Sequence, residues 1–197
     1  QTLVSLPDRE ARSGWAEAIK HGLILDIDLF HFLESEVDSL LSLDPQKTVN
    51  AIRWSAAVKA GVVSRDERET RGLRTLLNYG HTIGHALEAT TKYGRFLHGE
   101  AVAIGMRGAA MISYRVGAIH SVEVLERQEA ILERFGLPNS FNDVDFRALQ
   151  EAMRVDKKTV GGQINWVLLE NLGHAVIRDD VPFELSLEVM EQLITEK

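Results

Sequence analysis

The 197-residue sequence contains no cysteine. This absence excludes disulfides, iron–sulfur clusters and thiolate nucleophiles, so a tightly held metal must be bound by histidine, aspartate or glutamate. That set of donors favours zinc or a similar divalent ion. A Walker A loop, a G-x-S-x-G elbow and a glycine-rich turn after a predicted strand are also absent. The sequence therefore carries no motif for nucleotide binding or for a serine nucleophile.

Long apolar runs and basic blocks are missing as well. No stretch of eighteen or more uncharged apolar residues occurs, and the N-terminus lacks the basic start and apolar run of a secretory signal. The 22 basic and 29 acidic residues give a formal net charge of −7, without a basic cluster that could neutralise a phosphate backbone. These absences predict a soluble, cytoplasmic chain that binds neither membranes nor nucleic acid.

Hydrophobic residues make up 45% of the chain, enough for one sizeable core, and most of them recur at helical spacing. Helices are expected over residues 8–25, 28–43, 45–63, 99–117, 122–135, 146–153 and 186–196. Two short apolar runs, 164–169 and 175–178, flank the turn segment 170–173 and predict a β-hairpin. Residues 1–197 are therefore predicted to form one mainly α, multi-helix domain with one small β-hairpin near the C-terminus.

The most polar helical pattern lies between residues 74 and 98. Arg74, Asn78, His81 and His85 are separated by steps of four, three and four residues, which on a continuous helix places all four side chains along one face. A third histidine, His98, immediately precedes the next predicted helix. This stretch predicts a site for a metal and a polar ligand, and the spacing of His81 and His85 would allow that pair to chelate one ion.

The same polar residues also fit simpler structural roles. The zincin motif is incomplete because Thr82 stands where that motif has glutamate. Histidine pairs on helices are commonly hydrogen-bonded structure, so a noncatalytic helical module is an alternative. Glu17 and Lys20, one turn apart, are most simply a solvated ion pair, and Lys59 most simply extends to water. The charged segment 64–72 is expected to be a solvated loop.

Four runs follow one another in order over nearly the whole chain: SGWAEAIKHGLILD, KAGVVSRDERETRGLRTLLNYGHTIGHALEA, LHGEAVAIGM and DKK. Together they resemble the C-terminal half of 3-dehydroquinate synthase. The resemblance implies a zinc or cobalt site formed by Glu17, His81 and His98. It also implies active-site roles for the following residues: Lys20, Lys59, Arg74, Asn78, His85, Lys157 and Lys158.

The resemblance further implies a reaction. Enzymes of that family are phosphate lyases that convert the sugar acid phosphate 3-deoxy-D-arabino-heptulosonate 7-phosphate to 3-dehydroquinate in the shikimate pathway of aromatic amino acid biosynthesis. The implied steps are transient oxidation by bound NAD, phosphate elimination, re-reduction, ring opening and aldol closure. Zinc would polarise the alcohol, while the lysines, the arginine and Asn78 would hold carboxylate and phosphate. His85 would serve in proton transfer, and the full-length enzyme is expected to be a homodimer.

Departures from the family pattern shape these expectations. The family normally carries an N-terminal α/β domain that binds NAD, and this sequence begins after it. We therefore expect no cofactor-binding residues in residues 1–197 and no activity from this chain alone. Segment 64–72 has one extra residue, and the choice between Lys157 and Lys158 as the substrate contact is open. Two further alternatives are another sugar phosphate cyclase and the helical half of a metal-dependent polyol dehydrogenase.

Overall fold

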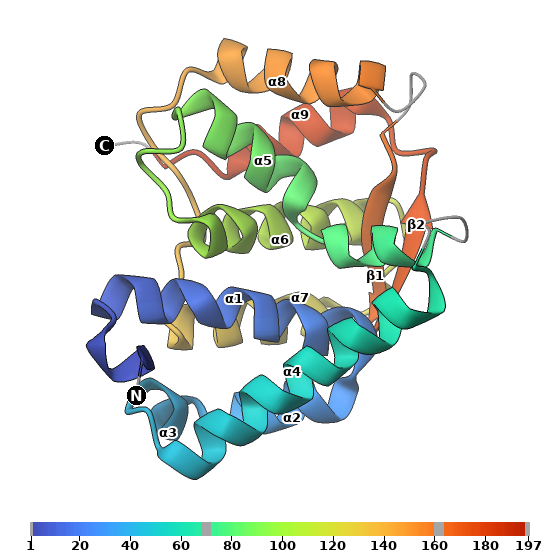
Figure 1. Ribbon diagram of the computed structural model, residues 1–197. Coiled ribbons are helices and arrows are strands. Elements are labelled where there is room, and N and C mark those ends of the chain that lie inside the picture. The colour runs from blue at the N-terminus through green and yellow to red at the C-terminus, as the bar shows by residue number, and fades with distance from the viewer. Residues whose placement is uncertain (1, 68–71, 160–163, 196–197) are drawn as a thin grey trace.

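A computed structural model describes residues 2–67, 72–159 and 164–195 (Figure 1). Its elements, in chain order, are η1 (Thr2–Ser5), α1 (Asp8–Leu25), α2 (Ile27–Ser35), α3 (Val37–Leu41), α4 (Pro45–Arg65), η2 (Leu73–Asn78), α5 (His81–Thr90), α6 (His98–Arg115), α7 (Val122–Arg134), α8 (Phe146–Thr159), β1 (Trp166–Asn171), β2 (His174–Arg178) and α9 (Phe183–Gln192). The predicted fold class, mainly α with one C-terminal hairpin, is confirmed over these residues.

Helix α6 is the central element of the fold. It runs between a layer formed by α5, α8 and α9 and a layer formed by α1, α7, α4 and α2 (Figure 1). Val102 and Met106 belong to the hydrophobic cluster on the α1 side, whereas Ile104 and Ile112 belong to the cluster on the α5 side. All four side chains are fully buried. The two halves of the core therefore share this one helix.

Glycines on α6 let neighbouring backbones approach it closely. A Cβ atom at Gly105 would lie 1.9 Å from the carbonyl oxygen of Gly80, and one at Gly99 would lie 2.0 Å from the carbonyl oxygen of Ser13. Neither space could hold a methyl group. These contacts place the start of α5 against the middle of α6, and the start of α6 against α1.

The hairpin covers one end of this helical assembly. Strands β1 and β2 pair antiparallel, with Trp166 opposite Arg178 and Leu168 opposite Val176. The hydroxyl of Ser113 on α6 accepts a hydrogen bond from the Leu169 amide at 3.1 Å, which fixes β1 against the central helix. Gly173, in the turn, has a φ of +77° and donates its amide hydrogen to the carbonyl of Leu23 on α1 at 2.8 Å.

Several predicted helix boundaries are wrong. The helix expected over 28–43 is divided into α2 and α3 at Glu36, whose φ of −111° and ψ of 16° interrupt the helix. The Glu36 carboxylate forms an ion pair with Lys47 on α4 at 2.6 Å, a long-range contact that no local sequence signal announces. Helix α8 runs beyond Met153 to Thr159, and α9 begins three residues earlier than expected, directly after Pro182.

The polar segment before His85 also differs from its prediction. Arg74 and Asn78 lie on the 3-10 helix η2, and the chain turns at Tyr79 and Gly80 before α5 begins at His81. Gly80 has a φ of +78°, and a Cβ atom there would lie 2.7 Å from the backbone nitrogen of Met106. The close contact with α6 and the left-handed backbone each require glycine at this position. The left-handed conformation also prevents one helix from continuing from Arg74 to His85.

The contact at Gly105 predicts a stability difference between two glycine substitutions. Gly105→Ala is expected to lower the free energy of unfolding by about 3 kcal/mol or more, because the methyl group would overlap the Gly80 carbonyl. Gly14→Ala on α1 is the control, since nothing lies within 4 Å of the new Cβ atom. That control is expected to raise stability by about 1 kcal/mol through helix propensity. Urea unfolding of the metal-free protein measures both, and equal effects would contradict the packing argument.

Candidate metal and substrate site

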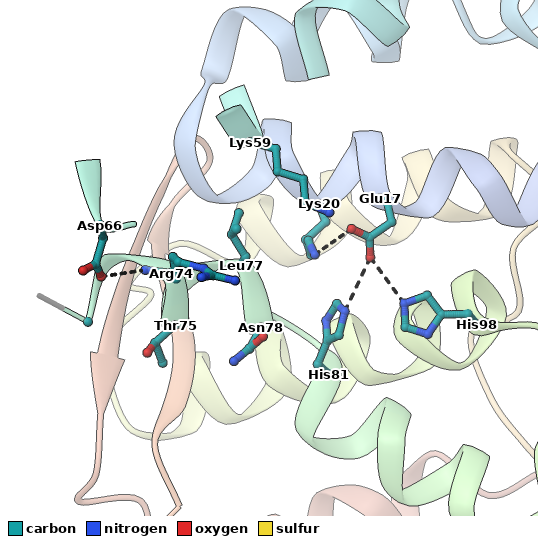
Figure 2. A pocket seen from close by; sticks show the side chains of 11 residues that line it. Glu17, Lys20, Lys59, Asp66, Arg74, Thr75, Leu77, Asn78, His81 and His98 are labelled. Carbon is teal, nitrogen blue, oxygen red and sulfur yellow. Dashed lines mark hydrogen bonds and ion pairs between the residues drawn. The ribbon is translucent and has the colours of Figure 1, made fainter. Parts of the chain in front are cut away.

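A cavity of about 550 Å³ opens where α1, α4, η2, α5 and α6 meet (Figure 2). Seven of the ten residues predicted to form a site line this cavity: Glu17, Lys20, Lys59, Arg74, Asn78, His81 and His98. They come from five separate elements, so the fold assembles in space what the sequence distributes over more than eighty positions.

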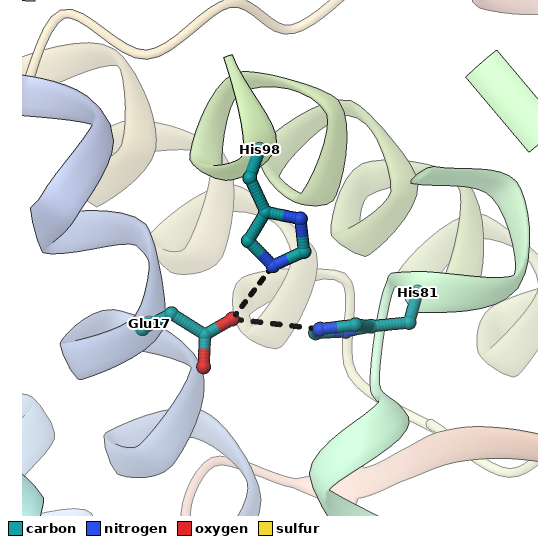
Figure 3. A group of neighbouring side chains, drawn as sticks. All are labelled: Glu17, His81 and His98. Carbon is teal, nitrogen blue, oxygen red and sulfur yellow. Dashed lines mark ion pairs between the residues drawn. The ribbon is translucent and has the colours of Figure 1, made fainter. Parts of the chain in front are cut away.

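Glu17, His81 and His98 direct one side-chain atom each toward a common point at the edge of the cavity (Figure 3). The Oε1 atom of Glu17 lies 3.5 Å from the Nε2 atom of His81 and 3.7 Å from the Nε2 atom of His98. All three potential ligand atoms lie within 4.8 Å of one another. Glu17 Oε1 is buried and has no hydrogen-bond partner.

These residues fit a zinc or cobalt ion. In a tetrahedral zinc site with bonds of about 2.0–2.1 Å, neighbouring ligand atoms are separated by about 3.3 Å, close to the distances between Glu17 and the two histidines. Two imidazoles and one carboxylate are also a common set in catalytic zinc sites, which keep a further position open. A cation would satisfy the buried Glu17 oxygen, whose lack of a partner is otherwise costly.

The far side of each imidazole is occupied by a hydrogen-bond acceptor. The Nδ1 atom of His81 lies 3.1 Å from the carbonyl oxygen of Tyr79, and the Nδ1 atom of His98 lies 3.1 Å from the Oε1 atom of Glu88. Because both partners accept, each Nδ1 is assigned the proton, which leaves the Nε2 lone pairs directed at Glu17. This is the tautomer that metal binding through Nε2 requires.

Lys20 sets the electrostatics on the other side of Glu17. Its Nζ atom lies 2.8 Å from Glu17 Oε2, and only 2% of Lys20 is exposed, so the interpretation as a solvated ion pair is wrong. Burial alone would raise the pKa of Glu17, but the Lys20 charge and hydrogen bond outweigh it and lower that pKa. Burial lowers the pKa of Lys20, against the opposing effect of Glu17. Burial and the Lys20 charge lower the pKa of His81 to about 4, which keeps its ring neutral at neutral pH.

The remaining wall of the cavity is cationic and polar. Lys59 reaches it from α4, whereas Arg74 and Asn78 reach it from η2 (Figure 2). Together with Lys20, the wall presents three cationic side chains and an amide within one small-molecule-sized space. This arrangement suits a ligand with carboxylate or phosphate groups, which guanidinium and ammonium groups bind through charge-assisted hydrogen bonds.

Asp66 is a cavity residue that the sequence patterns missed. It falls in the segment expected to be a solvated loop, yet only 2% of it is exposed. Its Oδ2 atom accepts hydrogen bonds from the backbone amides of Leu73 at 2.8 Å and Arg74 at 3.4 Å. Asp66 thereby ties the end of α4 to the start of η2, which carries Arg74. No periodicity or motif distinguishes this aspartate from its charged neighbours.

Three predicted residues are not among the described residues that line the cavity. The exposed ring of His85 has its centroid 5.1 Å from that of His81 and 6.2 Å from that of His98, but His85 does not line the cavity. Lys157 and Lys158 fall in the last turns of α8, and their side chains lie outside the part of the chain that the structure describes.

Two solved structures share this fold. The 2-epi-5-epi-valiolone synthase of Streptomyces hygroscopicus subsp. jinggangensis, solved with NAD+ and Zn2+ bound, matches 97% of this chain and 53% of its own, with a TM-score of 0.87 and 25% identity. A 2-deoxy-scyllo-inosose synthase complexed with carbaglucose-6-phosphate, NAD+ and Co2+ matches 95% of this chain and 53% of its own, with a TM-score of 0.80 and 27% identity. The fold is thus that of the helical half of sugar phosphate cyclases.

The sequence comparison identifies the family. The family model described as 3-dehydroquinate synthase C-terminal matches residues 14–159, and the chain belongs to that family. The 3-dehydroquinate synthase of Nitrosomonas europaea is 47% identical over 195 residues, which cover 99% of this chain and 52% of the relative. The chain therefore spans about half the length of the curated relatives it matches.

Among the described helices, none combines the length and hydrophobicity needed to cross a bilayer.

Metal analysis of single variants tests the candidate ligands. We expect zinc affinity to fall by about 100-fold or more in each of Glu17→Ala, His81→Ala and His98→Ala. Losing a residue that only hydrogen-bonds to a metal ligand costs about 10- to 100-fold, and losing a ligand itself should cost at least as much. His85→Ala is expected to retain the metal, because its ring is not part of the converging group. His174→Ala, an exposed histidine on β2, serves as the control.

Zinc content after dialysis and affinity from chelator competition measure these effects. Unchanged affinity in all three ligand variants would show that the histidines are structural. Loss of zinc in His85→Ala with retention in Glu17→Ala would move the metal to a different group of side chains.

Proposed function

We propose that residues 1–197 form the metal- and substrate-binding half of a 3-dehydroquinate synthase. The full-length enzyme would convert 3-deoxy-D-arabino-heptulosonate 7-phosphate to 3-dehydroquinate and phosphate, and an N-terminal domain outside these residues would bind NAD. One observation carries the proposal: a group of Glu17, His81 and His98 suited to a metal stands at the edge of a cavity lined by Lys20 and other cationic side chains. Membership of the family supports it.

Glu17, His81 and His98 would hold the zinc or cobalt ion. When bound, such an ion supplies Lewis acidity toward a substrate hydroxyl group. Zn2+ and Co2+ occur in the two solved neighbours, which also hold NAD+. Lys20, through its ion pair with Glu17 Oε2, would keep that carboxylate ionised and its Oε1 atom directed at the metal.

The cationic wall would bind the two anionic ends of the substrate. Lys59 and Arg74 would pair with carboxylate and phosphate oxygens, and Asn78 would donate a hydrogen bond from its amide. Holding both ends fixes the ring between them and excludes water from the cationic wall, which supplies orientation before any bond changes. His85, beside His81 and outside the cavity wall, would exchange a proton with a part of the substrate that extends past the metal ligands.

A related sugar phosphate cyclase is the second candidate function. The structural matches to the valiolone and inosose synthases favour it, because their folds agree with this chain over at least 95% of its length. The two candidates differ in whether the substrate carries a carboxylate. A site that needs both Arg74 and Lys59 for an acid and a phosphate would discriminate against sugar phosphates that lack the acid.

Turnover by the full-length protein tests the choice. With NAD and zinc, it is expected to release phosphate from the heptulosonate phosphate and form 3-dehydroquinate, whereas residues 1–197 alone are expected to be inactive. Phosphate release and product identity by mass spectrometry provide the measurement. Turnover by residues 1–197 with added NAD would contradict the two-part proposal. Turnover only of sugar phosphates without a carboxylate would identify the second candidate instead.

Substitutions in the cationic wall test the assignment of the anion-binding residues. In the full-length protein, Lys59→Ala and Arg74→Ala are each expected to lower kcat/KM by about 10- to 100-fold, the range of a lost charged hydrogen bond. Zinc content should stay unchanged, because neither side chain belongs to the metal group. Arg53→Ala, which removes an exposed cation from the same helix as Lys59, is the matched control. Equal effects at Arg53 and Lys59 would indicate a general charge effect.

A further inference from the structure

We propose that Glu88 is a positioning residue that orients the imidazole of His98 toward the metal without binding the metal itself. This inference rests on the metal site of the proposed function. Glu88 lies near the end of α5 and carries no role from any motif in the sequence. Its side chain is 9% exposed, and its Oε1 atom lies 3.1 Å from the Nδ1 atom of His98. Burying a carboxylate in this way is costly unless a partner satisfies it.

His98 needs such a partner more than His81 does. The side chain of His98 is 50% exposed and belongs to the first residue of α6, so little packing restricts its ring. The side chain of His81 is only 12% exposed, and the Tyr79 carbonyl holds its Nδ1 atom. Glu88 thus fixes the orientation of the exposed His98 ring, whereas burial and the Tyr79 carbonyl fix the orientation of the His81 ring. Outer carboxylates of this kind fix the ring orientation and raise the basicity of the ligating nitrogen.

The connection between α5 and α6 brings Glu88 and His98 together. The two residues are ten positions apart. Between them, Lys92 and Tyr93 both adopt left-handed backbone conformations, with φ values of 53° and 55°. The Tyr93 amide donates a hydrogen bond to the Glu88 carbonyl at 2.8 Å, which closes the end of α5. This turn reverses the chain, so that His98 at the start of α6 faces the buried carboxylate of Glu88 on α5.

A competing arrangement would make Glu88 a metal ligand. His85, Glu88 and His98 also place potential ligand atoms within 4.8 Å of one another. Two observations favour the outer role. Glu17 Oε1 is the carboxylate oxygen without a hydrogen-bond partner, whereas Glu88 Oε1 already has one in His98. The cavity is lined by Glu17, His81 and His98, but by neither His85 nor Glu88, so a metal in the second group would not face the cavity.

Zinc affinity of Glu88 variants tests this role without any substrate. Glu88→Ala is expected to bind one zinc per chain with about 10- to 100-fold lower affinity, the range for outer partners of metal ligands. Glu88→Gln keeps an oxygen acceptor for the His98 Nδ1 proton and is expected to recover most of that affinity. Glu170→Ala removes the partner of exposed His174, 3.2 Å away, and is the matched control for breaking a glutamate–histidine pair.

The absorption spectrum of the cobalt-substituted protein adds a readout that general destabilisation does not move. Glu88→Ala is expected to shift the visible Co2+ bands while their intensity stays that of a four- or five-coordinate site, and Glu170→Ala should leave them unchanged. The thermal midpoint of each metal-free variant controls for folding. If Glu88→Ala does not fold, Glu88→Asp, which withdraws the carboxylate from His98, replaces it with the same expectations.

Three results would overturn the inference. Wild-type affinity and an unchanged cobalt spectrum in Glu88→Ala or its replacement would remove any role in orienting His98. Equal loss in the alanine and glutamine variants would show that hydrogen bonding by Glu88 is not what matters. Loss of zinc in both Glu88→Ala and His85→Ala, with retention in Glu17→Ala, would make Glu88 a ligand. Zinc affinity is measured without substrate. The role of Glu88 can therefore be confirmed or rejected even if the full-length protein shows no dehydroquinate synthase activity.

Discussion

The backbone contact between the start of α5 and the middle of α6 is the constraint on which the rest of the site depends. At Gly105 a side chain would occupy the place of the Gly80 carbonyl oxygen, so the two helices meet with no atoms between their backbones. Gly80 in turn adopts a left-handed conformation that ends η2 and starts α5. This junction sets the position of His81 at the start of α5. Because His98 lies on α6, the junction also sets the distance between the two rings, whose centroids are 5.3 Å apart. A second close approach, of Ser13 to Gly99, adds the helix that carries Glu17.

Local patterns predicted most of the helices and the hairpin, because caps, apolar periodicity and turn residues act over a few positions. They failed where a distant contact decides the backbone. The helix is interrupted at Glu36, which pairs with Lys47 of another helix, and the turn at Gly80 packs directly against the backbone of α6. The grouping of Glu17 with His81 and His98 was likewise beyond spacing alone, since Glu17 is far away in the chain, and the spacing of His81 and His85 favoured a different pair. The family resemblance named these three residues together, and the structure places their potential ligand atoms within 4.8 Å of one another.

Charged residues in the interior were the hardest to foresee. Lys20, Asp66 and Glu88 are all nearly buried, although composition alone treats such side chains as solvated. Each has a particular partner: a carboxylate for Lys20, backbone amides for Asp66, and an imidazole for Glu88. The Lys20–Glu17 pair follows from helix spacing, but only the folded chain buries it and brings Asp66 and Glu88 to their partners. Lys20 and Asp66 line the cavity and Glu88 lies behind one of its histidines, so buried charges with assigned partners mark this region more clearly than exposed charges do.

The sharing of α6 by both hydrophobic clusters has a consequence for how a bound ion would leave. An ion held by Glu17, His81 and His98 joins α1, α5 and α6, three elements whose packing also closes the two halves of the core. Such an ion would act as a non-local cross-link across residues 17 to 98, and separating α1 from α6 would expose both the core and the coordination site. Amide hydrogen exchange in α1 that requires this separation would then slow when the ion is bound, because the ion stabilises only the closed arrangement.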